Sequence, residues 1–328
     1  MLKILKDLRE RAIDETNVHL LLPEAKDERI IKAAAEISKL NIAKVTLLGN
    51  EDEIKNAKNT KGISLDKVNF IIPEKSNDFN DYVNTYMELR KKKGIQKEEA
   101  VETIKDPTFF AAMMLKNNLA DICISGAMNP TSHVLKAGLR IVKMEEGIST
   151  MSSDIFMFSP DESRIFSFAD CAVVPDPTSE NLAEMAYITA KTHKSVFNVE
   201  PVVAMLSFST KGSGKHPLVE KVEKAVEIAK EKYPDLNVDG ELQADAAIVD
   251  AIGKKKAPGS KVAGKANVLI FPDLNSANIG YKLVQRLGGY EAVGPILQGL
   301  NKPMHDLSRG CSVDDIINLT VIAALQSQ

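Results

Sequence analysis

The chain has 328 residues, of which 44% are hydrophobic and 27% charged, and its formal net charge is -3. This length and composition are sufficient for two ordinary domains or one large one, and they exclude an extended disordered chain. The near-neutral charge balance gives no electrostatic reason to expect nucleic-acid binding, which requires a strongly basic surface.

Cysteine usage and the N-terminal sequence indicate where the protein works. Cys123, Cys171 and Cys311 are far apart and odd in number, so no disulfide framework is expected, and the five histidines lack metal-ligand spacing. Residues 1–7 carry charges every few positions and lack the apolar core of a signal peptide. No apolar run approaches the roughly 20 residues of a membrane span. We therefore expect a cytoplasmic protein with no metal and no membrane partner.

In the first part of the chain, short apolar runs alternate with helical patterns. The runs typical of buried strands are residues 19–22, 45–49, 68–72 and 121–125. Apolar residues recur at helical spacing over residues 28–40, 79–93 and 109–117. Strands buried on both faces and separated by helices predict a mostly parallel α/β sheet.

The pattern changes near residue 150. Residues 154–158 and 163–168 are extended runs joined by a good turn sequence at 159–162, which predicts a hairpin just after a domain boundary. A second α/β unit follows, with helices at 180–192, 218–233 and 277–287 and strands at 202–207 and 268–271. Residues 253–261 are predicted to form a loop. The last segment, 313–325, is predicted to form one amphipathic helix that packs back on the first unit.

The segment Ser308-Arg309-Gly310-Cys311 precedes this last helix. Ser312 stands at the N-cap position and Asp315 follows three residues later, which is the spacing of a capping box. Free N–H groups at a helix N-terminus favour anions, and arginine adds a bidentate fork suited to phosphate. This segment alone leaves two interpretations open: an anion site, or a capped helix with an arginine on its surface.

Two further arginines lie at predicted helix ends. Arg286 is followed by Gly-Gly, and Arg90 begins a basic run. A favourable charge at a helix C-terminus is the ordinary explanation of each, although a cluster of such groups could also bind phosphates. The glycine-rich segment 211–216 lacks the spacing of a phosphate-binding P-loop, and no dinucleotide fingerprint follows the first strand.

Taken together, many segments closely resemble the short, single-module form of phosphate acetyltransferase. The resemblance runs from about residue 25 to the C-terminus. It is dense in residues 88–94, 106–114, 125–127, 168–172, 204–213, 239–243, 256–260, 278–282, 285–289 and 294–303 and in the Ser308 segment. So many motifs in the same order make chance similarity negligible.

The resemblance implies two α/β/α domains with mostly parallel sheets, similar to isocitrate and isopropylmalate dehydrogenases, with the active site in the interdomain cleft. Domain I would combine residues 1–148 with 299–328, and domain II, residues 149–298, would form the interface of a homodimer. The implied substrates are coenzyme A, acetyl-CoA, acetyl phosphate and phosphate, and no tightly bound cofactor is expected.

The resemblance also implies a reversible reaction in which coenzyme A thiolate attacks acetyl phosphate in a ternary complex. Asp315 matches the proposed base, and Ser308 matches a residue that hydrogen-bonds the reacting carbonyl or phosphate. Arg309 matches the residue that binds phosphate and stabilises charge, with Arg286 assisting. Arg90 matches a coenzyme A contact.

Ser125 and Lys136 complete the expected substrate-binding residues. Lys136 stands where related sequences usually carry arginine, and lysine binds phosphate without a bidentate fork. Asn129-Pro130 and His305 are further departures. A carboxylate that caps a helix is in general a weaker base because N–H groups stabilise its charged form, so Asp315 is either the base or mainly a cap.

Two alternative functions remain. A phosphate butyryltransferase would have the same architecture with a roomier acyl pocket, and a pocket discriminates one methylene by only about 1–3 kcal/mol. A non-catalytic regulatory module that binds acyl-CoA is the alternative of another class. A dehydrogenase of the related fold is disfavoured because its metal-binding carboxylates and cofactor fingerprint are missing.

Overall fold

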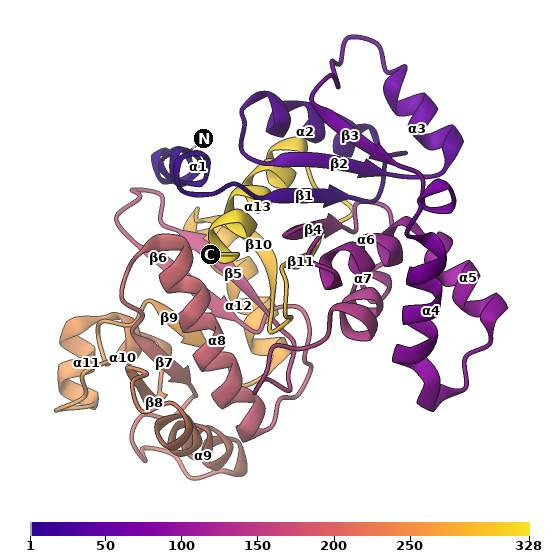
Figure 1. Cartoon of the computed structure of the whole chain (residues 1–328). Coiled ribbons are helices and arrows are strands. Elements are labelled where there is room, and N and C mark those ends of the chain that lie inside the picture. The colour runs from indigo at the N-terminus through magenta and orange to yellow at the C-terminus, as the bar shows by residue number, and fades with distance from the viewer. Residues whose placement is uncertain (1) are drawn as a thin grey trace. The chain divides into compact units, whose positions relative to one another are not determined.

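The structure is a computed structural model that describes residues 2–328. It divides into two compact units, one formed by residues 3–145 with 300–328 and the other by residues 146–299 (Figure 1). Among the described residues, no helix has the length and apolar character needed to cross a membrane.

Unit 1 contains a five-stranded sheet in the order β11-β4-β1-β2-β3, and every neighbouring pair is parallel. The strands are β1 (His19–Leu22), β2 (Lys44–Leu48), β3 (Val68–Ile71), β4 (Ile122–Ser125) and β11 (Met304–Asp306). From β1 the chain continues to β2 and β3 on one side, and then crosses to β4 on the other. The boundary between β1 and β4 is therefore a topological switch point, where open α/β sheets bind ligands at the carboxyl ends of their strands.

The described part of unit 1 contains eight α-helices. They are α1 (Lys3–Glu15), α2 (Glu28–Lys39), α3 (Glu51–Lys58), α4 (Phe79–Arg90), α5 (Lys97–Lys105), α6 (Pro107–Lys116), α7 (Thr131–Ala137) and α13 (Val313–Gln326). Of these, α2, α6, α7 and α13 pack on strands of this sheet. Helix α6 is buried from Thr108 to Leu115 and packs on β4. A wider π-type turn over residues 138–142 prolongs α7.

The last helix is present where the sequence predicts it, but its predicted amphipathic character is wrong. Its residues from Ile316 to Leu325 are buried except Asn318. The reason is that α13 packs on α1, α2 and β4 within unit 1. Helix α1, which the sequence did not predict, contributes the buried side chains Leu5, Leu8 and Ala12.

Unit 2 contains a six-stranded sheet in the order β10-β5-β6-β9-β7-β8. The strands are β5 (Ser152–Phe158), β6 (Ile165–Ala169), β7 (Val203–Leu206), β8 (Val238–Leu242), β9 (Val268–Ile270) and β10 (Glu291–Gln298). The predicted hairpin is confirmed, because β5 and β6 pair antiparallel with Phe158 opposite Ile165. β10 also pairs antiparallel with β5, and the other pairs are parallel. The predicted α/β class with mostly parallel sheets is thus confirmed.

The helices of unit 2 are α8 (Ser179–Phe197), α9 (Pro217–Lys232), α10 (Ala244–Ile248), α11 (Asp250–Lys256) and α12 (Leu274–Gly288). Helix α11 corrects the prediction of a loop over residues 253–261, since the first part of that segment is helical. A Cβ at Gly253 would lie only 2.6 Å from Gly264 N. This glycine therefore marks a close backbone approach inside the unit, and not a flexible loop.

Candidate active site

Three loops of unit 1 leave the carboxyl ends of neighbouring strands. Glu24 follows β1, residues 126–129 follow β4, and Ser308 and Arg309 follow β11. Because the strands are parallel, these loops meet at one edge of the sheet, at the switch point. The structure thereby brings the predicted Ser308-Arg309 segment next to the predicted Ser125-Gly126-Ala127 segment, about 180 residues away in sequence.

Arg309 crosses from its own loop to the loop after β4. Its Nη1 donates to Asn129 O at 2.8 Å and to Gly126 O at 3.2 Å, and its Nη2 donates to Thr131 Oγ1 at 2.9 Å. The Arg309 side chain is nevertheless 48% exposed, and Ser308 beside it is exposed as well. A cation that is fixed in position and still open to solvent is suited to binding a phosphate group.

Asp306 lies beneath this arginine and is only 4% exposed. Its Oδ2 accepts a hydrogen bond from Thr131 Oγ1 at 2.6 Å, and its Oδ1 lies 3.5 Å from Arg309 Nη1. Burial raises the pKa of the Asp306 carboxyl to about 6, although the hydrogen bond from Thr131 and the charge of Arg309 both act to lower it.

Glu24 is a second buried carboxylate at the same edge. Its two oxygens accept the backbone N–H groups of all four residues from Gly126 to Asn129, at 2.8 to 3.0 Å. Glu24 is 5% exposed. Four charge-assisted hydrogen bonds to consecutive N–H groups fix the conformation of this loop, and with it the carbonyl groups that hold Arg309.

Arg29, at the start of α2, ties the same loops together from the other side. Its Nη1 donates to Arg309 O at 2.7 Å and to Cys311 O at 2.9 Å, while Nη2 donates to Ala127 O at 3.0 Å. The guanidinium also pairs with Asp27 through Nε and Nη2, and this interaction lowers the pKa of the Asp27 carboxyl. Arg29 therefore braces the backbone of the Ser308 segment.

The capping box predicted at the start of α13 is confirmed. Ser312 N donates to Asp315 Oδ2 at 2.8 Å, and Asp315 N donates to Ser312 Oγ at 3.1 Å. Asp315 is exposed, so one of its oxygens caps the helix while the residue stays open to solvent. Its role as a base stays a prediction.

The two substrate-binding residues expected near the β4 loop are placed very differently. Ser125 is fully buried, with its Oγ 3.4 Å from Thr108 Oγ1 and its carbonyl accepting Leu307 N at 2.7 Å. Lys136 is exposed in the last turn of α7. One turn earlier, His133 pairs with Asp106 at 3.1 Å, and this hydrogen bond raises the pKa of the imidazole. Helix α7 thus carries a second basic group near Lys136.

Arg90 and Arg286 both lie at helix C-termini, as predicted. Arg90 is the half-buried last residue of α4, and Gly94 closes the following turn in the left-handed conformation with φ 67°. Arg286 is exposed in the last turn of α12 in unit 2, and Gly289 closes that helix with φ 69°. These placements satisfy the ordinary explanation of each arginine, and their contacts with substrate stay predictions.

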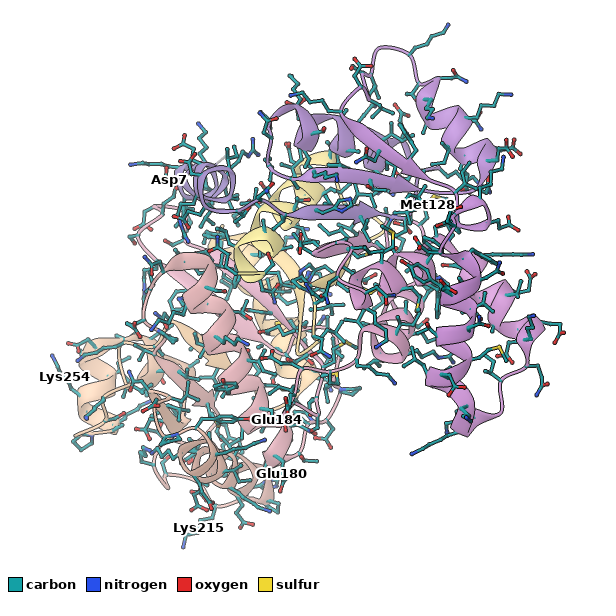
Figure 2. All side chains as sticks on the ribbon, in the orientation of Figure 1. Asp7, Met128, Glu180, Glu184, Lys215 and Lys254 are labelled. Atoms are coloured by element: carbon teal, nitrogen blue, oxygen red, sulfur yellow. The ribbon has the colours of Figure 1, made fainter. Side chains whose placement is uncertain are left out.

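The glycine-rich segment 211–216, which follows β7, already has carboxylates of the protein as its partners. Glu241, which is 2% exposed, accepts hydrogen bonds from Ser209 Oγ at 2.8 Å and from Gly212 N at 2.9 Å. Lys211 forms an ion pair with Asp239 at 2.6 Å. A carboxylate of the protein therefore occupies the position that an anion would need, while Lys215 projects away from the unit (Figure 2).

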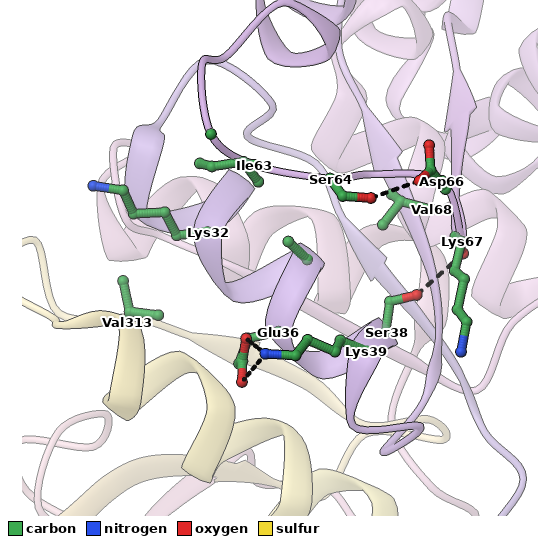
Figure 3. Close-up of a pocket in the computed structure, with 12 residues that line it drawn as sticks. Lys32, Glu36, Ser38, Lys39, Ile63, Ser64, Asp66, Lys67, Val68 and Val313 are labelled. Carbon is green, nitrogen blue, oxygen red and sulfur yellow. Dashed lines mark hydrogen bonds and ion pairs between the residues drawn. The ribbon is translucent and has the colours of Figure 1, made fainter.

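A pocket of about 540 Å³ lies elsewhere on unit 1, between α2 and the segment before β3 (Figure 3). It is lined by Lys32, Lys39 and Lys67 among others, and Lys39 is paired with Glu36 at 3.3 Å. The segment before β3 leads into the amino end of that strand, whereas the loops that hold Arg309 leave the carboxyl ends. Val313, next to the capping residue Ser312, also lines this pocket, whereas Ser308, Arg309 and Asp315 are not among its lining residues.

Four side chains that organise the site were given no role by the sequence, although one of them, Asp306, lies just before the predicted segment: Glu24, Arg29, Thr131 and Asp306. A sequence signal exists for two of them. Glu24 follows the predicted strand at 19–22 by two residues, and Asp306 directly precedes the Ser308 segment. Polar residues immediately after buried parallel strands are candidates for a site at the strand ends.

These features define a two-unit α/β protein with a candidate site for a phosphate group. Unit 1 is a doubly wound parallel α/β structure whose switch-point loops present a braced arginine suited to phosphate, and unit 2 is a second α/β structure.

The family model described as phosphate acetyl/butaryl transferase matches residues 3–324, and the chain belongs to this family. It is 48% identical to the phosphate acetyltransferase of Thermoanaerobacterium thermosaccharolyticum, with 100% of each chain covered. Its structure is similar to a phosphotransacetylase from Streptococcus pyogenes (TM-score 0.94, 43% identity, covering 100% of this chain and 99% of that one). It is also similar to one from Staphylococcus aureus (TM-score 0.92, 40% identity, 99% of each chain). The predicted resemblance is confirmed, and the chain is an acyltransferase.

Proposed function

We propose that this chain catalyses the reversible transfer of an acetyl group between phosphate and coenzyme A: acetyl-CoA + phosphate = CoA + acetyl phosphate. The observation that carries the proposal is the 48% identity, over the whole of both chains, to a protein named phosphate acetyltransferase. Coenzyme A enters as a substrate, so the reaction requires no tightly bound cofactor, and we propose that it takes place in the cytoplasm.

The proposed reaction proceeds in a ternary complex. The coenzyme A thiolate attacks the carbonyl carbon of acetyl phosphate, a C–S bond forms, and the C–O bond to phosphate breaks with its electron pair leaving on phosphate. A thiol has a pKa near 8.5, so a base assists its ionisation. Because the acyl phosphate is already activated, positioning and charge stabilisation supply most of the rate.

Arg309 and Ser308 have the central roles in this proposal. The guanidinium of Arg309 binds the phosphate group and stabilises the charge that develops on it, and the exposed Ser308 hydroxyl hydrogen-bonds the reacting carbonyl or a phosphate oxygen. Asp315 takes the thiol proton, with Arg286 assisting at the phosphate. Arg90, Lys136 and Ser125 contribute to substrate binding.

The test of this proposal is thioester formation from acetyl phosphate and coenzyme A, followed by absorbance. We expect Arg309→Gln to lower kcat by about 10²–10³, the usual effect of removing one group that stabilises the transition state. Arg11→Gln is the control, because Arg11 is an arginine of unit 1 whose partner is Glu15 on its own helix. An Arg309→Gln variant with wild-type kcat would show that the reaction does not take place at this loop.

A phosphate butyryltransferase is the second candidate, because the family description names both acyl groups. The two candidates differ in the ratio of kcat/KM for acetyl phosphate and butyryl phosphate. A higher kcat/KM with butyryl phosphate would replace the acetyl assignment. Binding of acyl-CoA without any turnover of either acyl phosphate would support the non-catalytic module instead.

We propose further that the chain is a homodimer through unit 2. Helix α12 exposes Ile279 at 58%, Leu283 at 52% and Leu287 at 82%, and these residues recur every four positions along one face. An exposed apolar stripe of this kind marks a protein interface. A second copy of this chain is the partner that the stripe would bind.

A further inference from the structure

The guanidinium of Arg309 has only part of its donor capacity left for a substrate. Nη1 carries two hydrogens and faces three carbonyl oxygens, those of Asn129 at 2.8 Å, Gly126 at 3.2 Å and Leu307 at 3.4 Å. Nη2 donates one hydrogen to Thr131 Oγ1. Within residues 2–328, no described contact uses Nε–H or the second Nη2 hydrogen. These two donors are therefore what Arg309 can offer to a pair of phosphate oxygens.

Thr131 fixes which hydrogens remain, and Asp306 fixes Thr131. A threonine hydroxyl has one hydrogen, and here it is donated to Asp306 Oδ2 at 2.6 Å. The lone pairs of Oγ1 must then face Arg309 Nη2, which donates at 2.9 Å. The second oxygen, Asp306 Oδ1, lies 3.5 Å from Arg309 Nη1 and adds charge attraction.

The backbone around Asp306 is built to admit this carboxylate. Asp306 is the last residue of β11 and pairs in register with Ser125 of β4, and Leu307 N donates to Ser125 O at 2.7 Å. Gly126 adopts φ +104°, and a Cβ on it would overlap Asp306 Oδ1. The lack of a side chain at residue 126 therefore leaves the space that Oδ1 occupies.

We propose that Asp306 is a positioning residue for acyl transfer, which acts through Thr131 Oγ1 to hold Arg309 with Nε–H and one Nη2–H presented to the phosphate oxygens. This inference rests on the proposed function. Asp306 does not touch the substrate, because its side chain is only 5% exposed. It gains and loses no proton in the reaction.

If Asp306 only stabilised the fold, its substitution would lower Tm and activity together. Asp306 faces the cation Arg309 from its own loop, the hydroxyl of Thr131 from α7 and the negative charge of Glu24 from the loop after β1. A carboxylate kept in a buried position next to another carboxylate is unfavourable for folding. Asp306→Asn is therefore expected to leave the Tm unchanged or raise it while activity falls.

The experiment compares Asp306→Asn, Thr131→Val and Thr131→Ser in the full chain, with acetyl phosphate and coenzyme A as substrates. We expect kcat to fall by about 10- to 100-fold in Asp306→Asn and Thr131→Val, with the KM for coenzyme A within about twofold of wild type. Thr131→Ser keeps the hydroxyl and should restore kcat to within about threefold. Because both residues act on Arg309 in series, the double variant Asp306→Asn/Thr131→Val should be no slower than the slower single variant.

Asp121→Asn is the matched control, because Asp121 is a carboxylate of unit 1 that accepts a backbone hydrogen bond from His19 at 2.9 Å, before β4. It should keep the wild-type kcat. The inference is overturned if Asp306→Asn turns over at the wild-type rate, if Thr131→Ser is as slow as Thr131→Val, or if losses of kcat simply follow losses of Tm. Each of these results leaves the proposed function standing as long as the wild-type enzyme is active. A wild-type chain that is inactive with both acyl phosphates would overturn the proposed function and this inference together.

Discussion

Asp315 is the residue at which a structural and a chemical role coincide. Its Oδ2 accepts the N–H of Ser312, so it caps α13, and the same carboxylate is the proposed base. Asparagine keeps an oxygen that can accept this hydrogen bond but cannot take a proton from the thiol. Asp315→Asn therefore separates the two roles without removing the cap.

If Asp315 is the base, Asp315→Asn should lower kcat by about 10²–10⁴ with little change in Tm, measured by acetyl transfer and thermal unfolding. Ser312→Ala is the matched control, since it removes the reciprocal half of the capping box at a cost of about 1 kcal/mol and keeps the carboxylate. A loss of less than about tenfold in Asp315→Asn would assign Asp315 to the cap alone.

Asp306 predicts a pH dependence of stability. Burial raises its pKa from the ordinary 3.8 to about 6 in the folded chain, so the folded state binds this proton more tightly than the unfolded state does. The resulting stabilisation is fully present below about pH 4 and is lost as the pH rises through about 6. On the order of 1–3 kcal/mol of unfolding free energy is involved.

Asp306→Asn removes this titration. Wild type should therefore lose stability relative to the variant as the pH rises from about 4 to 7. The free energy of unfolding of Asp306→Asn minus that of wild type should increase over this range, as measured by urea unfolding at a series of pH values. Asp121→Asn again serves as the control. A difference between Asp306→Asn and wild type that stays constant over this range would contradict the raised pKa of Asp306.

At the scale of elements, the sequence predicts short, uninterrupted apolar strands well, and interrupted or charged strands poorly. Strands β1 to β4 are short apolar runs, and their ranges agree with prediction to within a residue or so. Strand β10 was missed because Gly294-Pro295 interrupts it, and its pairing with β5 shifts register between Val293 and Ile296. Strand β8 was missed because it contains Asp239 and Glu241. Asp239 pairs with Lys211 and Glu241 accepts a hydrogen bond from Ser209, and both partners are distant in sequence.

The candidate site shows the same division between local and non-local information. The capping box at Ser312 and Asp315 is local, so its spacing in the sequence was enough to predict it. The contacts of Arg309 with Asn129 and Thr131 depend on β4 lying between β1 and β11, which local sequence does not encode. The same holds for Glu24, whose four partners lie more than 100 residues away.

The loop between β4 and α7 gives a prediction about this non-local packing. Gly126 has φ +104°, and a Cβ there would overlap Asp306 Oδ1 and lie 2.8 Å from Leu307 N. Gly126→Ala should lower the free energy of unfolding by about 1–3 kcal/mol more than the same substitution does at a glycine in open space. It should also lower kcat, because the loop that holds Arg309 must move.

The comparison is Gly62→Ala, since Gly62 also has a positive φ of +77°, but a Cβ on it would have no other atom within 4 Å. It reports the backbone strain alone, about 1–2 kcal/mol. Both variants are measured by urea unfolding and by acetyl transfer. If the two substitutions had equal effects on stability and on kcat, the loop after β4 would accommodate the added Cβ without displacing β11.

At the scale of the whole molecule, the family match over residues 3–324 covers both units. The residues expected to act on phosphate are divided between them, with Ser308, Arg309 and Asp315 in unit 1 and Arg286 in unit 2. Arg286 directly precedes Leu287, the most exposed residue of the apolar stripe on α12. An assembly through this stripe would therefore bury surface next to a residue expected to bind substrate.

The proposed homodimer is tested by placing a charge in the stripe. Leu283→Asp should convert a dimer into monomers in sedimentation, because burying an unpaired carboxylate in an apolar interface is strongly unfavourable. Leu218→Asp is the matched control, since Leu218 on α9 of the same unit is 50% exposed against 52% for Leu283 and lies outside the stripe. It should remain dimeric. A Leu283→Asp chain that sediments as a dimer, or a wild-type chain that is already monomeric, would rule out α12 as the interface. Loss of acetyl transfer in the Leu283→Asp monomer but not in the Leu218→Asp dimer would further show that activity depends on the assembly.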